Sequence, residues 1–443
     1  MKKILRRRQL NPAQILGLGL LLTIIIGALL LKLPIASKQP VSFLTCFFTA
    51  TSATTVTGLI TVFNGTTYTL FGNIVILLLI QLGGLGIMTF AVLIFLLMDK
   101  TISTRNRLLL QEALNQSTFG GIVLLVKRLF FFSMFFEFLF AFILFFRWLP
   151  EFGLTKSLYY SIFHAVSAFN NAGFSLFPDS MTRYVSDPII NSCLSLLIIL
   201  GGLGFTVMSE IWDKKRWHPL SLHSKIMIIG TIAFNVIAFV LIFAFEAHNP
   251  KTLETLSPGA KVWASLFQGV VTRTAGFNSV NIGDLKPETL FFMMIYMFIG
   301  AGSVSTGGGI KLTTFFALLL MAGAYIRKQR EPVLLERTIV FPDIFKALAV
   351  TVIAFGTVLF AIFLILIFES DRFPFINIAF EVVSAFGTVG MSTGITPHLN
   401  PASQLVICAM MIFGKLGPLS IALSLTSATT NAIRYPKGRL FIG

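Results

Sequence analysis

Long apolar runs alternate with shorter apolar segments along the whole chain, and charged residues gather between them. The long runs cover approximately residues 12–33, 68–98, 127–148, 189–212, 225–245, 290–326, 346–368 and 403–430. A helix of about 20 apolar residues crosses a hydrocarbon core of about 30 Å. The pattern therefore predicts an all-α polytopic membrane protein with eight transmembrane helices.

Four further apolar segments are too short to span a bilayer, and each lies between two long runs. They cover residues 40–53, 157–169, 258–271 and 374–386. A short loop follows each one, which is typical of a half-spanning helix that ends inside the membrane. The loop residues are Thr54, Thr55, Val56, Thr57 and Gly58; Asn170, Asn171, Ala172 and Gly173; Thr274, Ala275 and Gly276; and Thr388, Val389 and Gly390.

A second glycine-rich landmark recurs in step with these loops. It begins at Gly83, Gly201, Gly300 and Gly414, which follow the loop glycines by 25, 28, 24 and 24 residues. The loop glycines themselves lie 115, 103 and 114 residues apart. Two landmarks in register indicate an internal repeat. We predict four units of span, short loop and span around one pore, covering residues 1–98, 99–213, 214–330 and 331–443.

Composition and charge agree with this interpretation. Of the 443 residues, 55% are hydrophobic and 12% are charged, against about 25% charged in a soluble domain. The net charge of +16 would suggest nucleic acid in a soluble protein. Here Lys and Arg cluster at alternate helix ends, so the positive-inside rule explains them and no nucleic-acid partner is expected. We expect cytoplasmic termini, outward-facing loops, and segment 103–121 on the inner membrane surface.

Other classes of protein find little support. The first apolar run is long for a signal peptide and no A-x-A site follows, so we expect a retained helix. The three cysteines lie far apart and suggest neither a disulfide framework nor a metal site. No catalytic motif is present, so we do not expect an enzyme. A membrane-embedded enzyme or a scaffold for a partner complex is the alternative from another class.

The four loops have the chemistry of a cation filter. Non-helical backbone at membrane depth is stable only where protein or water surrounds it. Backbone carbonyls can replace the hydration shell of an alkali ion, and glycine allows the conformation that aims them at one axis. The C-terminal end of each short helix is partly negative and favours a cation. Helix packing is the main alternative role for the glycines of the second landmark.

The third unit contains an interruption that suggests a gate. Segment 300–311 is too rich in glycine and hydroxyl residues for a stable helix, and its spacing does not fit a phosphate-binding loop. Lysine is costly inside a membrane, so Lys311 and Lys415 are expected to face a watery cavity and limit ion flow, or else to bind carbonyls at helix breaks. The gate candidates are Gly300, Gly302, Ser303, Ser305, Thr306, Gly307, Gly308, Gly309, Lys311 and Lys415.

Four other polar residues lie close to the predicted filter. We expect Arg273 to brace the outer mouth, with direct ion gating as the alternative. Glu381 is expected to cap loop amides. Glu137 and His164 are expected to form local hydrogen bonds rather than to conduct protons.

The loops resemble those of a known family. The sequences TVTG, NNAGF, TRTAGFN and GTVGM, which contain Gly58, Gly173, Gly276 and Gly390, look like the filter loops of the Trk/Ktr/HKT superfamily of potassium transporters. The length and the broken third span are most similar to the KtrB-type membrane subunits of bacterial Ktr systems. The family commonly has arginine where this chain has Lys415, and lysine cannot form a bidentate fork.

The resemblance implies a function and partners. It implies K⁺ uptake across the bacterial plasma membrane, with Na⁺ stimulation, through a K⁺-channel-like fold. It also implies a homodimer and a cytosolic ring of RCK-domain subunits (KtrA or KtrC type) that bind ATP or ADP. Residues 327–337 and 214–216 are candidate contacts for that ring, although solvated positive-inside charge explains them equally well. The alternative function on the same fold is an ammonium pathway or a less selective Na⁺/K⁺ pathway.

Overall fold

The computed structural model describes residues 12–86, 89 and 122–417. The predicted surface segment 103–121 lies outside the described residues. The ends of the second and eighth predicted spans, beyond residues 86 and 417, lie outside them as well.

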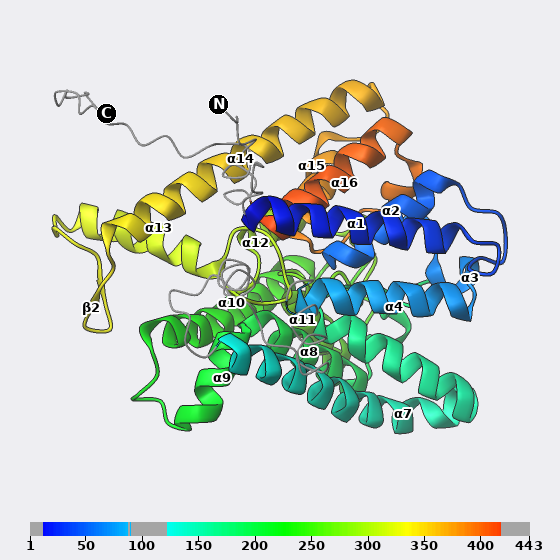
Figure 1. The fold of residues 1–443 in the computed structure, drawn as a ribbon, viewed down its shortest axis with the longest axis horizontal. Helices are drawn as coiled ribbons and strands as arrows, with labels where there is room; N and C mark the ends of the chain where they lie inside the picture. The colour runs from blue at the N-terminus through cyan, green and yellow to red at the C-terminus, as the bar shows by residue number, and fades with distance from the viewer. Residues whose placement is uncertain (1–11, 87–88, 90–121, 418–443) are drawn as a thin grey trace, which may run out of the picture.

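The described chain is mostly helical (Figure 1). Its helices in the first half are α1 (Pro12–Lys32), α2 (Phe43–Thr55), α3 (Asn64–Thr67), α4 (Leu70–Leu85), α7 (Ile122–Phe169), α8 (Pro188–Leu203), α9 (Phe205–Lys214) and α10 (Leu222–Glu246). Those in the second half are α11 (Pro258–Val271), α12 (Pro287–Ile299), α13 (Leu312–Ile326), α14 (Phe341–Glu369), α15 (Phe375–Gly387) and α16 (Pro401–Leu416). Three 3₁₀ turns cover Thr182–Tyr184, Ile282–Asp284 and Thr396–His398. An antiparallel hairpin of β1 (Val333–Leu334) and β2 (Arg337–Thr338) joins α13 to α14.

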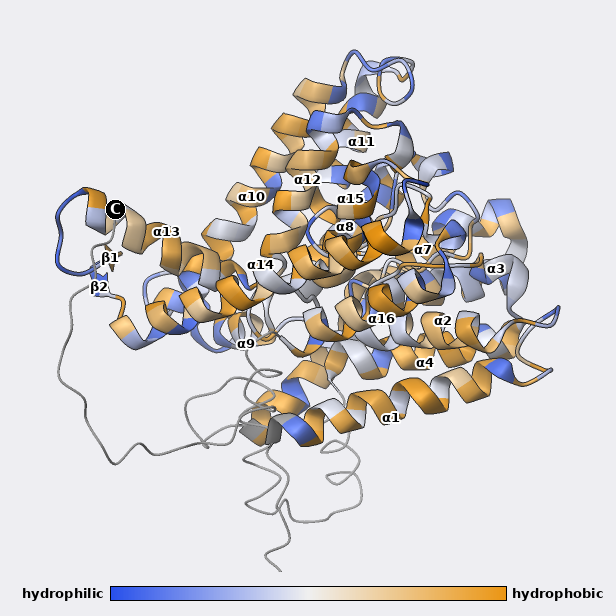
Figure 2. Ribbon diagram, turned by 90° about the horizontal axis from the view of Figure 1, so that it is seen from above, coloured by the Kyte–Doolittle hydropathy of each residue, from blue (hydrophilic) through white to orange (hydrophobic). Residues whose placement is uncertain are grey.

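Four of the described helices, α1, α7, α10 and α14, are long and apolar enough to cross a bilayer, and the bent pair α8–α9 would make a fifth span. Helices α4, α12, α13 and α16 are apolar but shorter. Apolar residues cover the outside of the long helices as well as the inside (Figure 2). On α14, for example, Phe345, Phe360 and Phe363 are each about 60% exposed. A helix that is apolar on all sides is typical of a membrane span, so the predicted polytopic all-α fold is confirmed.

The short helices end within a few residues of the positions predicted from the sequence. α11 has the predicted bounds, and α2 and α15 differ from theirs by a few residues. The second short helix is continuous with the preceding span in α7, and the two parts meet at a kink. Gly153 has φ 72° and ψ 176° there, three residues after Pro150. Proline removes a backbone donor and disrupts the helix around it, which separates the span from the half-spanning segment.

A glycine ends each of three second spans with nearly the same backbone conformation. The φ and ψ angles are 85° and 132° at Gly86, 105° and 130° at Gly204, and 85° and 137° at Gly417. Positive φ of this kind is readily accessible only to glycine. After Gly204 the chain bends by 93° into α9. The expectation that residues 189–212 form one continuous span is therefore wrong, and the interruption predicted only for the third unit has a counterpart in the second.

A buried carboxylate fastens the two spans of the third unit together. Glu246 is the last residue of α10 and is fully buried. One of its oxygens accepts hydrogen bonds from the backbone N–H of Lys286 (2.9 Å) and the hydroxyl of Thr289 (2.5 Å). The other accepts from the Asn249 amide (2.6 Å) and the Thr252 hydroxyl (2.7 Å). Since Lys286 caps α12, this carboxylate joins the end of one span to the start of the next.

We predict that Glu246→Ala destabilises the protein, because it leaves several buried donors without an acceptor. Each such donor costs about 1–3 kcal/mol, so the thermal unfolding temperature in detergent should fall by roughly 5 °C or more. Glu254→Ala is the matched control, because it removes a nearby exposed carboxylate and should leave that temperature unchanged. Equal shifts of the unfolding temperature for the two variants would contradict the structural role assigned to Glu246.

Candidate functional site

The four loop glycines share a left-handed backbone conformation. Their φ angles are 95° at Gly58, 67° at Gly173, 65° at Gly276 and 90° at Gly390. Each glycine also lies so close to another loop that it has no room for a side chain. Both facts restrict these positions to glycine.

The close approaches follow one closed order around the molecule. A Cβ on Gly58 would meet the carbonyl oxygen of Ala172, and one on Gly173 would meet that of Ala275. A Cβ on Gly276 would meet the carbonyl oxygen of Val389, and one on Gly390 would meet that of Thr57. Each loop therefore touches the next, and the fourth touches the first. Segments more than 100 residues apart in the sequence thus form one ring, and the order of the loops around the ring is their order in the chain.

In loops one, two and four, the same backbone hydrogen bonds form where the short helix ends and the loop begins. The residue two positions before the glycine has positive φ: Val56 (59°), Asn171 (58°) and Thr388 (49°). Its N–H donates to the carbonyl three residues earlier at 3.0–3.1 Å, and the next N–H donates to the carbonyl five residues earlier at 2.7–2.9 Å. This pattern satisfies carbonyls that the helix end leaves free.

A serine six residues before the loop glycine braces the same three loops. Ser52 Oγ accepts from Gly58 N at 3.0 Å, and Ser384 Oγ accepts from Gly390 N at 3.1 Å. In the second loop, Ser167 Oγ donates instead to the Phe174 carbonyl at 2.8 Å. Reasoning from the sequence missed these serines, although their constant spacing from the glycine was a visible signal.

The third loop is held differently. The residue six positions before Gly276 is Val270, not a serine. Gln268 makes the bracing contacts instead. The Gln268 amide contacts the backbone N–H of Ser279 (3.4 Å) and the sulfur of Met391 (3.6 Å), which follows the fourth loop glycine. The amide of this glutamine thus connects the third loop to the fourth.

Buried carboxylates lie behind the second and fourth loops. Glu137 on α7 accepts from Ser133 Oγ (2.7 Å), Gln81 Nε2 (3.1 Å) and Asn170 Nδ2 (3.1 Å). Since Gln81 lies on α4 and Asn170 begins the second loop, Glu137 holds that loop against two spans. Local hydrogen bonding, as expected from the sequence, accounts for its contacts.

Glu381 lies on the fourth short helix, α15, and contacts the chain that follows the fourth loop glycine. Its oxygens accept from Thr393 N (2.9 Å), Ser392 Oγ (2.6 Å) and Thr396 Oγ1 (2.6 Å). A loop amide is therefore among its donors, as expected. The carboxylate fixes the stretch of chain that leaves the fourth loop glycine.

His164 and Arg273 are buried near the loops. The ring nitrogens of His164 lie 2.7 Å from the Tyr160 carbonyl oxygen and 3.3 Å from Leu176 N. Both nitrogens therefore form local hydrogen bonds with the backbone. The Arg273 guanidinium lies beside Gly202, 3.5 Å from the place a Cβ would take. Arg273 therefore lies between its own loop and the end of α8 at Leu203, and the bracing of the outer mouth stays a prediction.

The second-landmark glycines let the spans approach the ends of the short helices. A Cβ on Gly83, Gly201 or Gly414 would collide with the carbonyl oxygen of Thr54, Phe169 or Phe386, respectively. Each of these carbonyls belongs to the last turn of a short helix. Helix packing, considered above as the alternative role, accounts for these contacts.

Segment 300–311 separates α12 from α13 and folds back beneath the ring. It is fastened to the second unit by three backbone hydrogen bonds, one of which runs from Thr306 N to the Gly201 carbonyl at 3.3 Å. Gly302 N donates to the Gly202 carbonyl at 3.0 Å, and Phe205 N donates to the Val304 carbonyl at 2.9 Å. The predicted interruption of the third unit is therefore present, and the corner between α8 and α9 supports it.

The same segment touches two of the four loops by hydrogen bonds. Gly308 N donates to Thr388 Oγ1 in the fourth loop at 2.8 Å. The side-chain amide of Asn171 in the second loop lies 3.0 Å from Thr306 Oγ1. A Cβ on Gly307 would also meet the Thr274 side chain of the third loop. The segment therefore lies directly against one side of the ring.

Both candidate lysines bind carbonyls of this segment. Lys311 Nζ donates to the Gly307 carbonyl at 2.5 Å, and Lys415 Nζ donates to the Thr306 carbonyl at 2.6 Å. Of the two roles expected for them, carbonyl binding matches the observed contacts. The two lysine side chains therefore reach adjacent residues of the segment on the same side of the ring.

Comparison with known proteins gives the family. The family described as "TrkH: Cation transport protein" matches residues 14–432. The chain is 48% identical to "Ktr system potassium uptake protein B" of Bacillus subtilis (strain 168), covering 100% of this chain and 99% of the relative. It is 39% identical to a protein of the same name from Vibrio alginolyticus, covering 96% and 93%.

Two further relatives extend the comparison. The chain is 35% identical to "Potassium/sodium uptake protein NtpJ" of Enterococcus hirae, covering 100% of this chain and 99% of that one. The fold is similar to the crystal structure of the potassium transporter TrkH from Vibrio parahaemolyticus, with a TM-score of 0.75 at 19% identity, covering 95% of this chain and 86% of that one. At that identity the likeness supports the fold alone. The chain belongs to the TrkH family of cation transport proteins.

Proposed function

We propose that this protein takes up potassium ions as the ion-translocating membrane subunit of a Ktr-type system. The observation that carries the proposal is the closed ring of four glycine loops, each at the carbonyl end of a short helix. The names of relatives at 48% and 39% identity support K⁺ as the ion.

The ring supplies the selectivity filter in this proposal. Neutral carbonyl oxygens of the loops replace the water around a dehydrated cation. The carbonyl ends of α2, α7, α11 and α15 add a partial negative charge that favours a cation over an anion. The filter residues are those of the four loops predicted from the sequence, with Ser52, Ser167, Ser384 and Gln268 as their supports.

Segment 300–311 acts as the gate. It lies on the inner side of the ring, and its two lysines bring positive charge close to the ion path. At an effective dielectric constant of about 20, a unit charge 4 Å away opposes a cation by about 4 kcal/mol. Conduction therefore requires the segment to move aside. A regulator that holds the inner helix ends differently in two nucleotide states would shift the balance between the two positions.

The proposed assembly is a homodimer in the bacterial plasma membrane with both termini in the cytoplasm. Each subunit has its own pore, and a cytosolic ring of RCK-domain subunits that bind ATP or ADP controls them. Na⁺ stimulates uptake. The support comes from the "Ktr system" in the relatives' names, the family resemblance, and the basic residues at the inner helix ends.

A less selective Na⁺/K⁺ pathway is the second candidate. The Enterococcus hirae relative is named for both potassium and sodium, and a carbonyl filter differs little between the two activities. The ion dependence of uptake distinguishes them, because a K⁺-selective pore loses little K⁺ uptake when Na⁺ is in excess.

Expression in a bacterium that lacks its own K⁺ uptake systems tests the function. We expect growth at low external K⁺, with an empty vector as the control. Normal protein levels in the membrane without growth, both alone and with a regulatory subunit, would contradict K⁺ uptake.

We predict that Gly58→Ser, Gly173→Ser, Gly276→Ser and Gly390→Ser each weaken the preference for K⁺ over Na⁺. A side chain disfavours positive φ and collides with the neighbouring carbonyl, so it turns an oxygen away from the axis. The measurement is the K⁺ and Na⁺ dependence of uptake. Gly356→Ser is the matched control, because a Cβ there meets nothing within 4 Å. Unchanged selectivity in all four well-expressed variants would refute the filter assignment.

We predict that deletion of residues 303–308 raises K⁺ flux in cells without a regulatory subunit. The segment lies directly against the loops and is held there by individual hydrogen bonds, so its removal opens the inner side of the ring. The measurement is the initial rate of K⁺ uptake, normalised to protein in the membrane.

Lysine variants refine the same experiment. Lys415→Gln removes one bond to the segment and should raise flux less than the deletion does. Lys415→Arg keeps a charge and a donor, so its flux should stay near that of the parent. A folded deletion variant that is no faster than the parent would rule out the gate.

A further inference from the structure

Helix α9 lies across the direction of the spans at the end of the bundle where α7 and α10 begin (Figure 1). Its inward side chains, such as Val207 and Met208, are buried against the spans. Its outward side chains are large and apolar. Ile211 is 39% exposed, Trp212 59% and Trp217, in the turn that follows, 48%.

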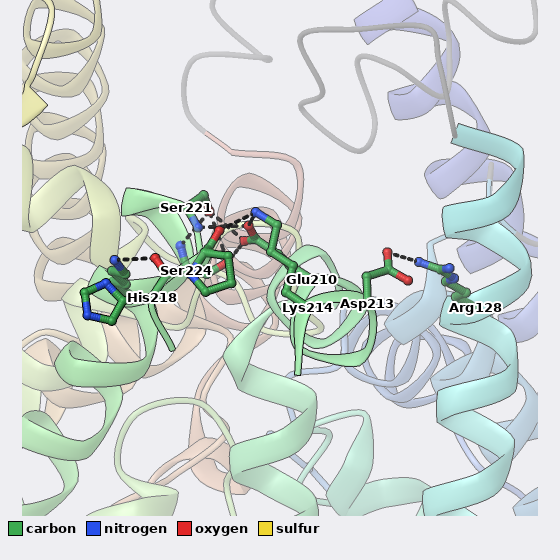
Figure 3. Close-up of polar contacts among 9 residues, drawn as sticks. Arg128, Glu210, Asp213, Lys214, His218, Ser221 and Ser224 are labelled. Atoms are coloured by element: carbon green, nitrogen blue, oxygen red, sulfur yellow. Dashed lines mark hydrogen bonds and ion pairs between the residues drawn. The ribbon is translucent and has the colours of Figure 1, made fainter. Parts of the chain in front are cut away.

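Both acidic groups of α9 are neutralised by partners from the same molecule (Figure 3). Asp213 forms an ion pair with Arg128 of α7 at 2.6 Å. Glu210 forms an ion pair with Lys214 at 2.5 Å and accepts from Ser221 N at 2.8 Å. These contacts fix α9 between two spans and leave little negative charge on its outer side.

Two cations follow directly at the end of the helix. Lys215 has φ 52° and its N–H donates to the Ile211 carbonyl, which closes the helix and starts the turn. Lys215 and Arg216 are exposed, and neither lies within ion-pair distance of a carboxylate in the described part of the chain. The outer side of this corner therefore combines two indoles with two uncompensated positive charges.

We propose that residues 211–217 form a binding surface for the headgroups of anionic phospholipids. Indole rings favour the boundary between hydrocarbon and headgroups, and exposed Lys and Arg attract anionic lipid at the membrane surface. A helix in the plane of the interface with an apolar side and flanking cations is typical of such contacts. Two cations and no free acid match the negative charge of this lipid class.

One backbone hydrogen bond connects α9, which carries this surface, to segment 300–311. Phe205, the first residue of α9, donates its backbone N–H to the Val304 carbonyl. A lipid bound at the other end of α9 holds this short rigid helix in place and with it the support of the segment. The effect of bound lipid on segment 300–311 rests on the proposed function, whereas lipid binding by α9 does not.

Fluorescence quenching of the purified full-length protein in vesicles tests the lipid contact. The vesicles contain phosphatidylcholine with a minor fraction of either brominated phosphatidylglycerol or brominated phosphatidylcholine. We expect the anionic quencher to be more effective for the parent. Each cation at an anionic surface is worth about fivefold in affinity, so Lys215→Gln with Arg216→Gln should lower the preference about 25-fold.

Two further variants keep the result interpretable. Arg327→Gln with Lys328→Gln removes the same charge from another exposed segment at the end of α13 and should leave the quenching preference unchanged. Lys215→Glu with Arg216→Glu should reverse it. Equal quenching by both lipids in the parent, or a preference that survives both changes at 215 and 216, would overturn the proposal. Indoles that neither lipid quenches would point to a protein partner and would overturn it too.

The link to the segment has its own readout. K⁺ flux of the parent in vesicles should change with the phosphatidylglycerol content, and this dependence should disappear in the Lys215→Gln, Arg216→Gln variant. Flux that responds equally in both proteins would overturn the link. Absence of any flux would count against the proposed function, while the quenching result would stand independently.

Discussion

The structure depends on the need to surround non-helical backbone with protein inside the membrane. Four loops leave their helices at membrane depth, where unsatisfied polar groups are costly. They meet this requirement by touching one another, each glycine against the carbonyl of the next loop. The ring can close only if no side chain stands between the loops. This constraint explains why the loop glycines have positive φ and why their neighbours are so uniform in loops one, two and four.

Closing the ring sets requirements for the layer around it. The short helices must come close to the second spans, and glycines at Gly83, Gly201 and Gly414 allow this approach. The loops must also be held from behind. Serine hydroxyls do this inside three of the loops, and the carboxylates of Glu137 and Glu381 do it between elements. Buried charges are costly unless hydrogen bonds satisfy them, and both carboxylates have several donors. Polar residues in this membrane protein thus serve chiefly to position the backbone.

The segment under the ring breaks the repeat, and its surroundings adapt to it. Hydrogen bonds from the second, third and fourth units hold its backbone, and two lysines donate to adjacent carbonyls at Thr306 and Gly307. Such contacts are numerous but individually modest, at about 1 kcal/mol each. A segment held in this way can be displaced without unfolding the spans. The right-angle corner at Gly204 links the segment to α9, because Phe205 N donates to the Val304 carbonyl.

The sequence by itself determined the elements, because hydrophobic run length and helix-breaking residues are local properties. The short segments, the repeat, the four loop glycines and the interruption at 300–311 were all predictable in this way. Other features depended on distant contacts. Nothing local shows that Gly390 meets Thr57, that Glu137 reaches Asn170, or that Lys415 reaches Thr306, because each pair is brought together only by the packing of separate units. The bend at Gly204 was missed because the residues on both sides are apolar and continue the pattern of one span. Hydropathy records how much apolar chain is present, whereas the direction of that chain is decided by backbone geometry and by the neighbours it packs against.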